Sequence, residues 1–169
     1  LSEGLNLDNE ISKVDLPKSG VQPGQKCKFA GWSNNQILFD ESENSDSGSD
    51  SESDSGPATK KRKIDINQGG QSNYLTWTQF EVQDKLSCAK KSTPQRDNEF
   101  CAEGFYDENT KKDSRGMAAC PGDSGSPLVC NNVLYGLVSS SRCSIYFPTS
   151  FVDVHKHLDN FIYKHIKCL

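Results

Sequence analysis

Hydrophobic and polar residues alternate in several short segments of this chain, which is the pattern of β-strands with one buried face. These segments are separated by polar residues, glycines and prolines, which favour turns. The strands predicted in this way cover residues 26–32, 74–82, 126–130, 133–139 and 148–154. Only Asn131 and Asn132 separate the third from the fourth, and this spacing predicts a β-hairpin.

The C-terminal residues follow a different period. Apolar side chains recur at intervals of three or four residues from position 154 to 167, which predicts an amphipathic helix. The stripe consists of Val154, Leu158, Phe161, Ile162 and Ile166. Residues 82–91 predict one or two helical turns, and residues 1–25 form a loop-like opening. The pattern therefore indicates a mostly β chain that ends in a helix.

One segment departs from this pattern because it contains almost no apolar residues. Residues 40–63 hold seven of the 23 acidic residues and four of the 19 basic ones. Such a composition cannot bury enough apolar surface to order itself, so we expect a disordered insert at 40–70. The insert divides the chain into a first segment, 1–39, and a main segment, 71–169.

Charge and hydropathy exclude two classes of partner. Outside residues 40–63 acidic and basic residues nearly balance, so no basic field for nucleic acid is expected. No apolar run approaches the roughly 20 residues that span a bilayer.

Seven cysteines are a high number for 169 residues, and they are spread along the chain. No CxxC pair and no Cys/His cluster has zinc-ligand spacing, so disulfides in an oxidising compartment are favoured over a metal site. No cofactor is expected. The odd number leaves one thiol that is free or bonded to another chain. The opening residues resemble the interior of a domain, so any signal peptide would precede them.

The most distinctive stretch is ACPGDSGSPLVC, residues 119–130. Serine is a weak nucleophile that needs a base for its proton and donors for the oxyanion it forms. Glycines around Ser124 would allow a sharp turn that leaves the N–H groups of Gly122 and Ser124 exposed. The same residues also fit a disulfide-tied turn with a solvent-exposed serine.

The wider context resembles the trypsin/chymotrypsin family of serine proteases. The matching segments are CKFAGW, FCAEG, ACPGDSGSPLVC, YGLVSS and PTSFVDVHKHLDNFI, in that order. The resemblance implies an all-β, chymotrypsin-like double β-barrel, of which this chain supplies mainly the C-terminal barrel and its terminal α-helix. In the family pattern Ser124 is the nucleophile, and the N–H groups of Gly122 and Ser124 form the oxyanion hole. Asp123 is the buried carboxylate that pairs with a newly cut amino terminus, as expected for a zymogen.

The resemblance also implies disulfides and a specificity pocket. It pairs Cys27 with Cys130, Cys88 with Cys101, and Cys120 with Cys143, which leaves Cys168 as a surface thiol or an interchain bridge. The S1 pocket would be built from Ala118, Ala119, Ser139, Ser140, Ser141 and Thr149. Trypsin-like members carry an aspartate where Ala118 stands, so cleavage after Lys or Arg is disfavoured. Thr149 narrows the pocket, which favours small or medium apolar residues.

The chain lacks the other half of the family's active site, since the catalytic His and Asp belong to the N-terminal barrel. His155, His157 and His165 lie on or beside the predicted helix, and we interpret them as exposed polar residues. Leu1-Ser2-Glu3-Gly4 does not match the family's activating terminus. We therefore expect a secreted, two-chain serine endopeptidase whose partner chain supplies His and Asp, with polypeptide as the substrate.

Two alternatives belong to other classes. A non-catalytic homologue would use the fold as a binding module, and Ser126 departs from the glycine most common at its position. An adhesive or mineral-binding protein would act through the acidic insert, where Ser47, Ser49 and Ser51 precede acidic residues in the pattern of acidophilic kinase sites. KKRK at 60–63 resembles a nuclear localisation signal, but disulfides favour a processing site or a partner for the acidic run.

Overall fold

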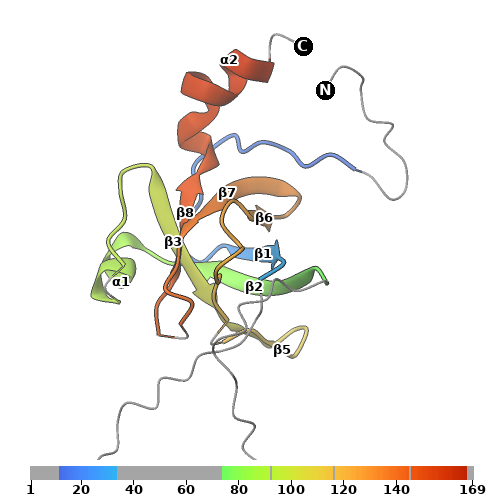
Figure 1. Ribbon diagram of the computed structural model, residues 1–169, viewed down its shortest axis with the longest axis vertical. Helices are drawn as coiled ribbons and strands as arrows, with labels where there is room; N and C mark the ends of the chain where they lie inside the picture. The colour runs from blue at the N-terminus through green and yellow to red at the C-terminus, as the bar shows by residue number, and fades with distance from the viewer. Residues whose placement is uncertain (1–11, 34–73, 92, 116, 145, 167–169) are drawn as a thin grey trace, which may run out of the picture.

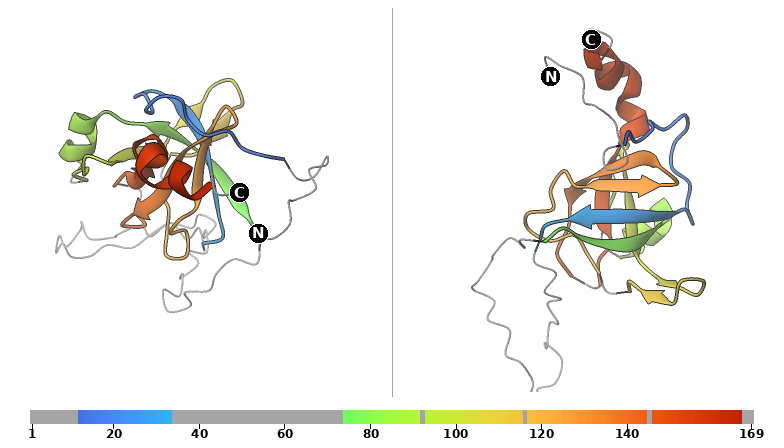
Figure 2. Two further views of the ribbon diagram at one scale, coloured as in Figure 1. Left: turned by 90° about the horizontal axis from the view of Figure 1, so that it is seen from above. Right: turned by 90° about the vertical axis from the view of Figure 1, so that its right-hand side faces the viewer.

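Six antiparallel strands close into a barrel in the computed structural model, which describes residues 12–33, 74–91, 93–115, 117–144 and 146–166. Around the barrel the strand order is β1-β2-β3-β8-β7-β6 (Figure 1). Their bounds are β1 Lys26–Gly31, β2 Thr76–Val82, β3 Glu99–Gly104, β6 Pro127–Cys130, β7 Val133–Ser140 and β8 Thr149–Asp153. The views in Figure 2 show the C-terminal helical segment projecting from one end of this barrel.

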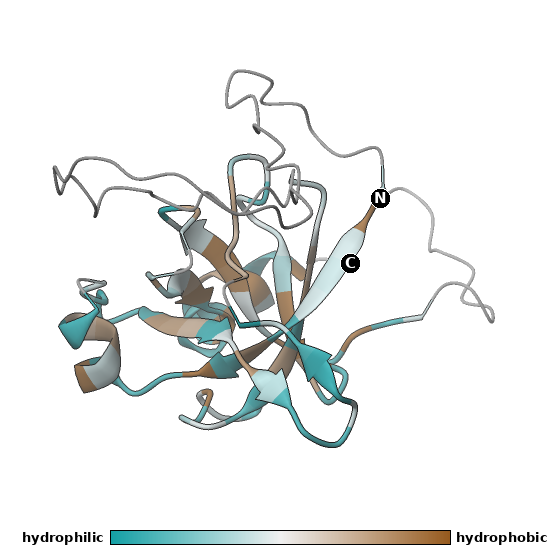
Figure 3. Cartoon of the chain, turned by 90° about the horizontal axis from the view of Figure 1, so that it is seen from below, coloured by the Kyte–Doolittle hydropathy of each residue, from teal (hydrophilic) through white to brown (hydrophobic). Residues whose placement is uncertain are grey.

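The alternation in the sequence becomes the inside and the outside of the barrel, because successive side chains on a strand point to opposite faces. In β1 the buried residues are Cys27, Phe29 and Gly31, and in β2 they are Thr78, Phe80 and Val82. Hydrophilic and hydrophobic residues correspondingly alternate along several strands in Figure 3. The strands predicted at 26–32, 74–82 and 148–154 are therefore confirmed to within two residues at either end.

The barrel interior is filled by four phenylalanines from four different strands. The rings of Phe29 and Phe80 stack with centroids 5.3 Å apart, and those of Phe100 and Phe151 stack at 5.6 Å. Edge-on contacts join the two pairs, with Phe80 and Phe151 at 6.1 Å. Such pairs contribute about 0.5–1.5 kcal/mol each beyond the burial of their surface. This cluster fixes the strands that carry the site.

The predicted hairpin is present, with β6 and β7 joined through Asn131 and Asn132. Both residues have positive φ values, 51° and 64°, as a two-residue hairpin turn of type I′ requires. The parallel bridge between Asp15 and Val133 places the opening segment beside this hairpin.

Three strands are absent from the sequence predictions. Besides β3, they are β4 Tyr106–Asp107 and β5 Lys112–Asp113, which pair with each other in a small hairpin outside the barrel. This hairpin contacts the outer side of β2, where Gln79 Nε2 donates to Asp107 Oδ2 and Lys112 Nζ donates to the Trp77 carbonyl. The long stretch between Glu103 and Met117 thus folds against β2.

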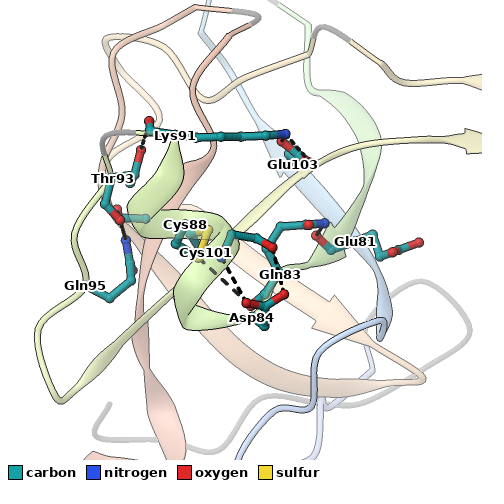
Figure 4. Close-up of a disulfide and its surroundings, with 11 residues drawn as sticks. Glu81, Gln83, Asp84, Cys88, Lys91, Thr93, Gln95, Cys101 and Glu103 are labelled. Carbon is teal, nitrogen blue, oxygen red and sulfur yellow. Dashed lines mark hydrogen bonds and ion pairs between the residues drawn. A yellow bond between two sulfur atoms is a disulfide. The ribbon is translucent and has the colours of Figure 1, made fainter.

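The short helix α1, Lys85–Lys90, lies between β2 and β3 and agrees with the turns predicted at 82–91. Asp84 caps its first turn by accepting hydrogen bonds from the N–H and hydroxyl of Ser87. These bonds, that from the Ser87 N–H first, lower the pKa of Asp84. The disulfide Cys88–Cys101 fastens α1 to β3, and Lys91 pairs with Glu103 nearby (Figure 4).

The C-terminal segment is helical but less regular than the sequence predicts. A 3-10 turn, η1 (Val154–His157), leads into a π-helical turn, η2 (Leu158–Ile162), and then into α2 (Tyr163–Ile166). Val154 and Leu158 are buried, whereas Phe161 and Ile166 are exposed. The predicted terminal helix is therefore confirmed, while the far part of its apolar stripe is exposed because the segment extends away from the barrel (Figure 1).

Within the described residues, no helix has both the length and the hydrophobicity needed to cross a bilayer. Several sequence predictions fall outside these residues: the insert at 40–70 with its serines and KKRK, the terminus Leu1–Gly4, and Cys168.

Candidate functional site

The turn between Cys120 and Ser126 presents the serine that the sequence marks as a nucleophile. Ser124 is exposed, and its hydroxyl forms no hydrogen bond with a described residue. Gly122 and Gly125, on its two sides, have φ values of 103° and 81°, a region that residues with a Cβ rarely adopt. The glycines therefore allow the sharp turn that raises Ser124 above the barrel.

Backbone hydrogen bonds fix this turn and leave two of its amides available. The Asp123 N–H donates to the Cys120 carbonyl at 3.0 Å, and the Ser126 N–H donates to the Asp123 carbonyl at 2.9 Å. The Gly125 N–H is bonded to β7 through the Val138 carbonyl at 3.0 Å. Within the described part of the chain, the Gly122 and Ser124 N–H groups have no such acceptor. Two unpaired donors beside an exposed hydroxyl are what binding of an oxyanion needs.

The Asp123 carboxylate points away from the surface and is held inside the barrel. The residue is 1% exposed, and three donors serve its two oxygens. The Ser33 N–H donates to Oδ1 at 3.0 Å, the Ser33 hydroxyl donates to Oδ2, and the Cys120 N–H donates to Oδ2 at 3.0 Å. None of the ion pairs among the described residues involves Asp123. The sequence did not single out Ser33, which lies 90 positions away.

The six residues predicted for the S1 pocket come from two regions of the chain, the stretch before Ser124 and the segment from the end of β7 to the start of β8. Ala119 and Thr149 are each 1% exposed, and the Ala119 N–H donates to Thr149 Oγ1 at 3.1 Å. Thr149 Oγ1 also lies 3.5 Å from Ser141 Oγ. The structure thus brings Ala119, Ser141 and Thr149 together. Ser139 turns to a different partner, since its hydroxyl donates to Glu99 Oε1 at 2.8 Å.

A surface cavity of about 270 Å³ adjoins this region. Seven residues line it, and neither Ser124 nor Ala118 is among them: Thr93, Pro94, Ser140, Ser141, Arg142, Pro148 and Ser150. Ser140 and Ser141 therefore face open space, while Thr149 closes the interior behind them.

Among the described residues three disulfides form, and they are the pairs that the resemblance implies: Cys27–Cys130, Cys88–Cys101 and Cys120–Cys143. One of them bears on the site. Cys120–Cys143 joins the start of the nucleophile turn to the β7–β8 connection, whereas Cys27–Cys130 joins the start of β1 to the end of β6, at the hairpin with β7. The positions of Ser124 and its supporting residues are thus covalently restrained.

The histidines lie elsewhere, and two of them have side-chain hydrogen-bond partners. His157 Nε2 is 3.2 Å from Asn98 Nδ2, and His165 Nδ1 is 2.7 Å from the Phe161 carbonyl. His155 lies on η1 beside them. None of the three forms a hydrogen bond with Ser124, so the described residues place no histidine against its hydroxyl.

Comparison with known proteins agrees with this arrangement. A family model described as Trypsin matches residues 63–162. Mast cell protease 8 of Mus musculus is 27% identical over 156 residues, covering 91% of this chain and 48% of the relative. Trypsin-3 of Salmo salar is 30% identical over 143 residues, covering 82% and 43%. Cathepsin G of Homo sapiens is 28% identical over 163 residues, covering 94% and 48%.

Among solved structures, neuropsin, described as a serine protease expressed in the limbic system of mouse brain, has the same fold. Its TM-score is 0.61 at 20% sequence identity, and the match covers 95% of this chain and 56% of neuropsin. The chain spans about half the length of the curated relatives it matches.

Proposed function

Since the chain belongs to the trypsin family of serine proteases, we propose that it is the nucleophile-bearing part of a serine endopeptidase. Its histidine and aspartate come from outside these 169 residues. The observation that carries this proposal is the exposed Ser124 hydroxyl next to the unpaired amides of Gly122 and Ser124.

The chemistry follows from these groups. The Ser124 hydroxyl adds to a peptide carbonyl carbon while its proton passes to the histidine of the other part. The carbonyl oxygen, now negatively charged, accepts hydrogen bonds from the Gly122 and Ser124 amides. The histidine then protonates the departing amine, and water releases the acyl group from Ser124.

Substrate preference rests on the residues of the predicted S1 pocket. Ala118 provides no negative charge for a Lys or Arg side chain, so burying such a cation there would cost several kcal/mol. Thr149 is buried and its hydroxyl accepts a hydrogen bond from the Ala119 N–H, so the predicted S1 pocket is shallow beside Thr149. Small or medium apolar residues at P1 fit these walls best. In the proposed enzyme, Ser139, Ser140 and Ser141 would pair with the substrate backbone as an added β-strand.

The remaining parts of the proposal concern assembly. The partner chain carries His and Asp, and Cys168 is a candidate for a bridge to it. Asp123 is the candidate for pairing with an amino terminus freed by cleavage. Disulfides fit a secreted protein in an oxidising compartment.

Labelling with a fluorophosphonate probe tests the central claim. The native protein, isolated with whatever chain supplies the histidine, should be modified at Ser124 and lose the label in Ser124→Ala. Ser87→Ala, which alters a serine of α1, is the matched control and should retain it. Absence of label from correctly processed native protein would favour the alternative, a non-catalytic homologue that acts as a binding module.

A further inference from the structure

A serine outside the nucleophile turn determines the surroundings of Asp123. We propose that Ser33 is a positioning residue of the active site. Its amide and hydroxyl hold the Asp123 carboxylate, and this keeps the turn in the form that leaves the Gly122 and Ser124 amides unpaired. The inference deepens the proposed function and rests on it.

The contacts of Ser33 explain why it has this role. It is 2% exposed and follows the end of β1, so the barrel fixes its position. Its N–H reaches one carboxylate oxygen and its hydroxyl reaches the other, so that one residue serves both. A Cβ placed on Gly122 would lie 3.9 Å from Ser33 Cα, which shows that Ser33 packs against the turn itself.

The carboxylate in turn fixes the backbone around it. Asp123 Oδ2 accepts from the Cys120 N–H, while the backbone of Asp123 bonds to Cys120 and Ser126. Both the backbone and the side chain of Asp123 thus bond to other residues of the turn, and Ser33, two residues after β1, supplies two of the three donors that the described residues offer its carboxylate. A buried carboxylate that loses a donor retains its desolvation cost, so the turn would rearrange to find another partner.

The charge of the buried Asp123 carboxylate makes the two donors of Ser33 more important for the structure of the turn. None of the described cations pairs with Asp123, so neutral donors alone stabilise this buried charge within the described residues. Hydrogen bonds to an ionised group are about twice as strong as those between neutral groups. Removing the Ser33 hydroxyl therefore takes away one of the three donors that the described residues supply to this carboxylate.

The test compares three variants of the native protein, isolated with the chain that supplies the histidine. Ser33→Ala retains the N–H donor and removes only the hydroxyl. Ser33→Thr retains the hydroxyl. Ser114→Ala is the matched control, because Ser114 is also fully buried and its hydroxyl accepts a bond from Gln79 at the outer hairpin.

We expect Ser33→Ala to lower the rate of fluorophosphonate labelling at Ser124 by about 100-fold, since misplacement of a reacting group by about 1 Å has that effect. In peptide hydrolysis kcat should fall while KM stays within about twofold, because the substrate pocket is unchanged. Ser33→Thr should restore most of the rate, and Ser114→Ala should keep it. Labelling of Ser33→Ala at the normal rate would overturn the inference.

Hydrogen exchange separates this inference from the proposed function. Amides of residues 119–126 should exchange faster in Ser33→Ala than in Ser114→Ala, whether or not the native protein reacts with the probe. If the native protein is not labelled but residues 119–126 exchange faster in Ser33→Ala than in Ser114→Ala, the protease proposal is refuted and the role of Ser33 is supported. Unchanged exchange in this segment would refute that role. If Ser33→Ala does not fold, Ser33→Cys, which retains the volume with a weak donor, provides the same comparison.

Discussion

The Ala119 amide and the Thr149 side chain are joined by a hydrogen bond of 3.1 Å, although the two residues are 30 positions apart. Both are 1% exposed, so the bond lies inside the barrel wall rather than on its surface. It ties the stretch that leads to Ser124 to the start of β8. Thr149 therefore has two effects: it satisfies a buried donor and it fills the space behind the predicted S1 walls.

In the proposed protease, replacing Thr149 by glycine should broaden the specificity for the P1 residue. Loss of the side chain opens space behind Ser141, so that kcat/KM for peptides with Phe at P1 should rise at least about 10-fold relative to peptides with Ala. Steady-state kinetics with a matched pair of peptides measures this ratio. Thr149→Ser, which keeps the hydroxyl that Ala119 needs, should leave it within about twofold. An unchanged ratio in Thr149→Gly would show that Thr149 does not limit the pocket.

Adding a methyl group at Gly31 should disturb the nucleophile turn through the buried Asp123 carboxylate. A Cβ at this position would overlap with Asp123 Oδ1 and lie 2.9 Å from its Cγ. The carboxylate and β1 would have to separate, at a cost of about 1–3 kcal/mol or more for forced overpacking. We expect Gly31→Ala to lower the urea midpoint of unfolding and to slow labelling of Ser124.

Gly20→Ala is the control for this experiment, because its nearest neighbour would be Asp153 Oδ2 at 4.0 Å. It should unfold at nearly the normal urea concentration and react with the probe normally. Equal behaviour of the two variants would mean that β1 and the carboxylate can move apart freely.

The barrel could be predicted to the extent that its strands bury one face and expose the other. In β1 and β2 inward and outward residues alternate, so their positions follow from the sequence. In β3 three consecutive residues, Phe100, Cys101 and Ala102, are all buried, so no alternation marks it. The strands β4 and β5 have two residues each and depend on contacts with β2, which no local pattern records.

The same distinction applies to the site. The glycines around Ser124 specify a turn locally, and the resemblance to the family gives that turn its interpretation as a nucleophile motif. Ser33 gives no such signal, because its role arises only when β1 and the turn meet across 90 positions of sequence. The requirement of a buried Asp123 for donors was foreseeable, but the identity of those donors depended on the fold.

Removing disulfides should destabilise the barrel according to the length of loop that each one closes. The bridges Cys27–Cys130 and Cys88–Cys101 have similarly buried sulfurs but span 103 and 13 residues. Chain-entropy arguments give about 4–5 kcal/mol for the longer loop and about 3 kcal/mol for the shorter. Double alanine variants compared by urea unfolding should follow that order. A larger loss from the Cys88–Cys101 pair would mean that strain or local packing outweighs loop closure.

Asp113 in the β4–β5 hairpin should make a contribution to the free energy of unfolding that depends on pH in the acid range. Hydrogen bonds from Arg115, those of the side chain first and that of the backbone second, lower the pKa of Asp113 from 3.8 to about 2. The folded state thus binds this proton more weakly than the unfolded state does. The resulting stability is complete above pH 3.8 and is lost as the pH falls through about 2. The effect should be small, because both side chains are exposed and solvent screens the pair.

Carbon NMR of the Asp113 carboxyl group measures this pKa directly. In Arg115→Gln the titration midpoint should rise from about 2 toward 3.8, since the guanidinium that donates to Asp113 is gone. Lys111→Gln is the matched control, because it removes a neighbouring cation that forms none of the ion pairs found in the described residues, and its midpoint should stay near 2. Equal midpoints in the two variants would show that Arg115 does not hold the carboxylate in solution. The hairpin would then owe its order to its contacts with β2 alone.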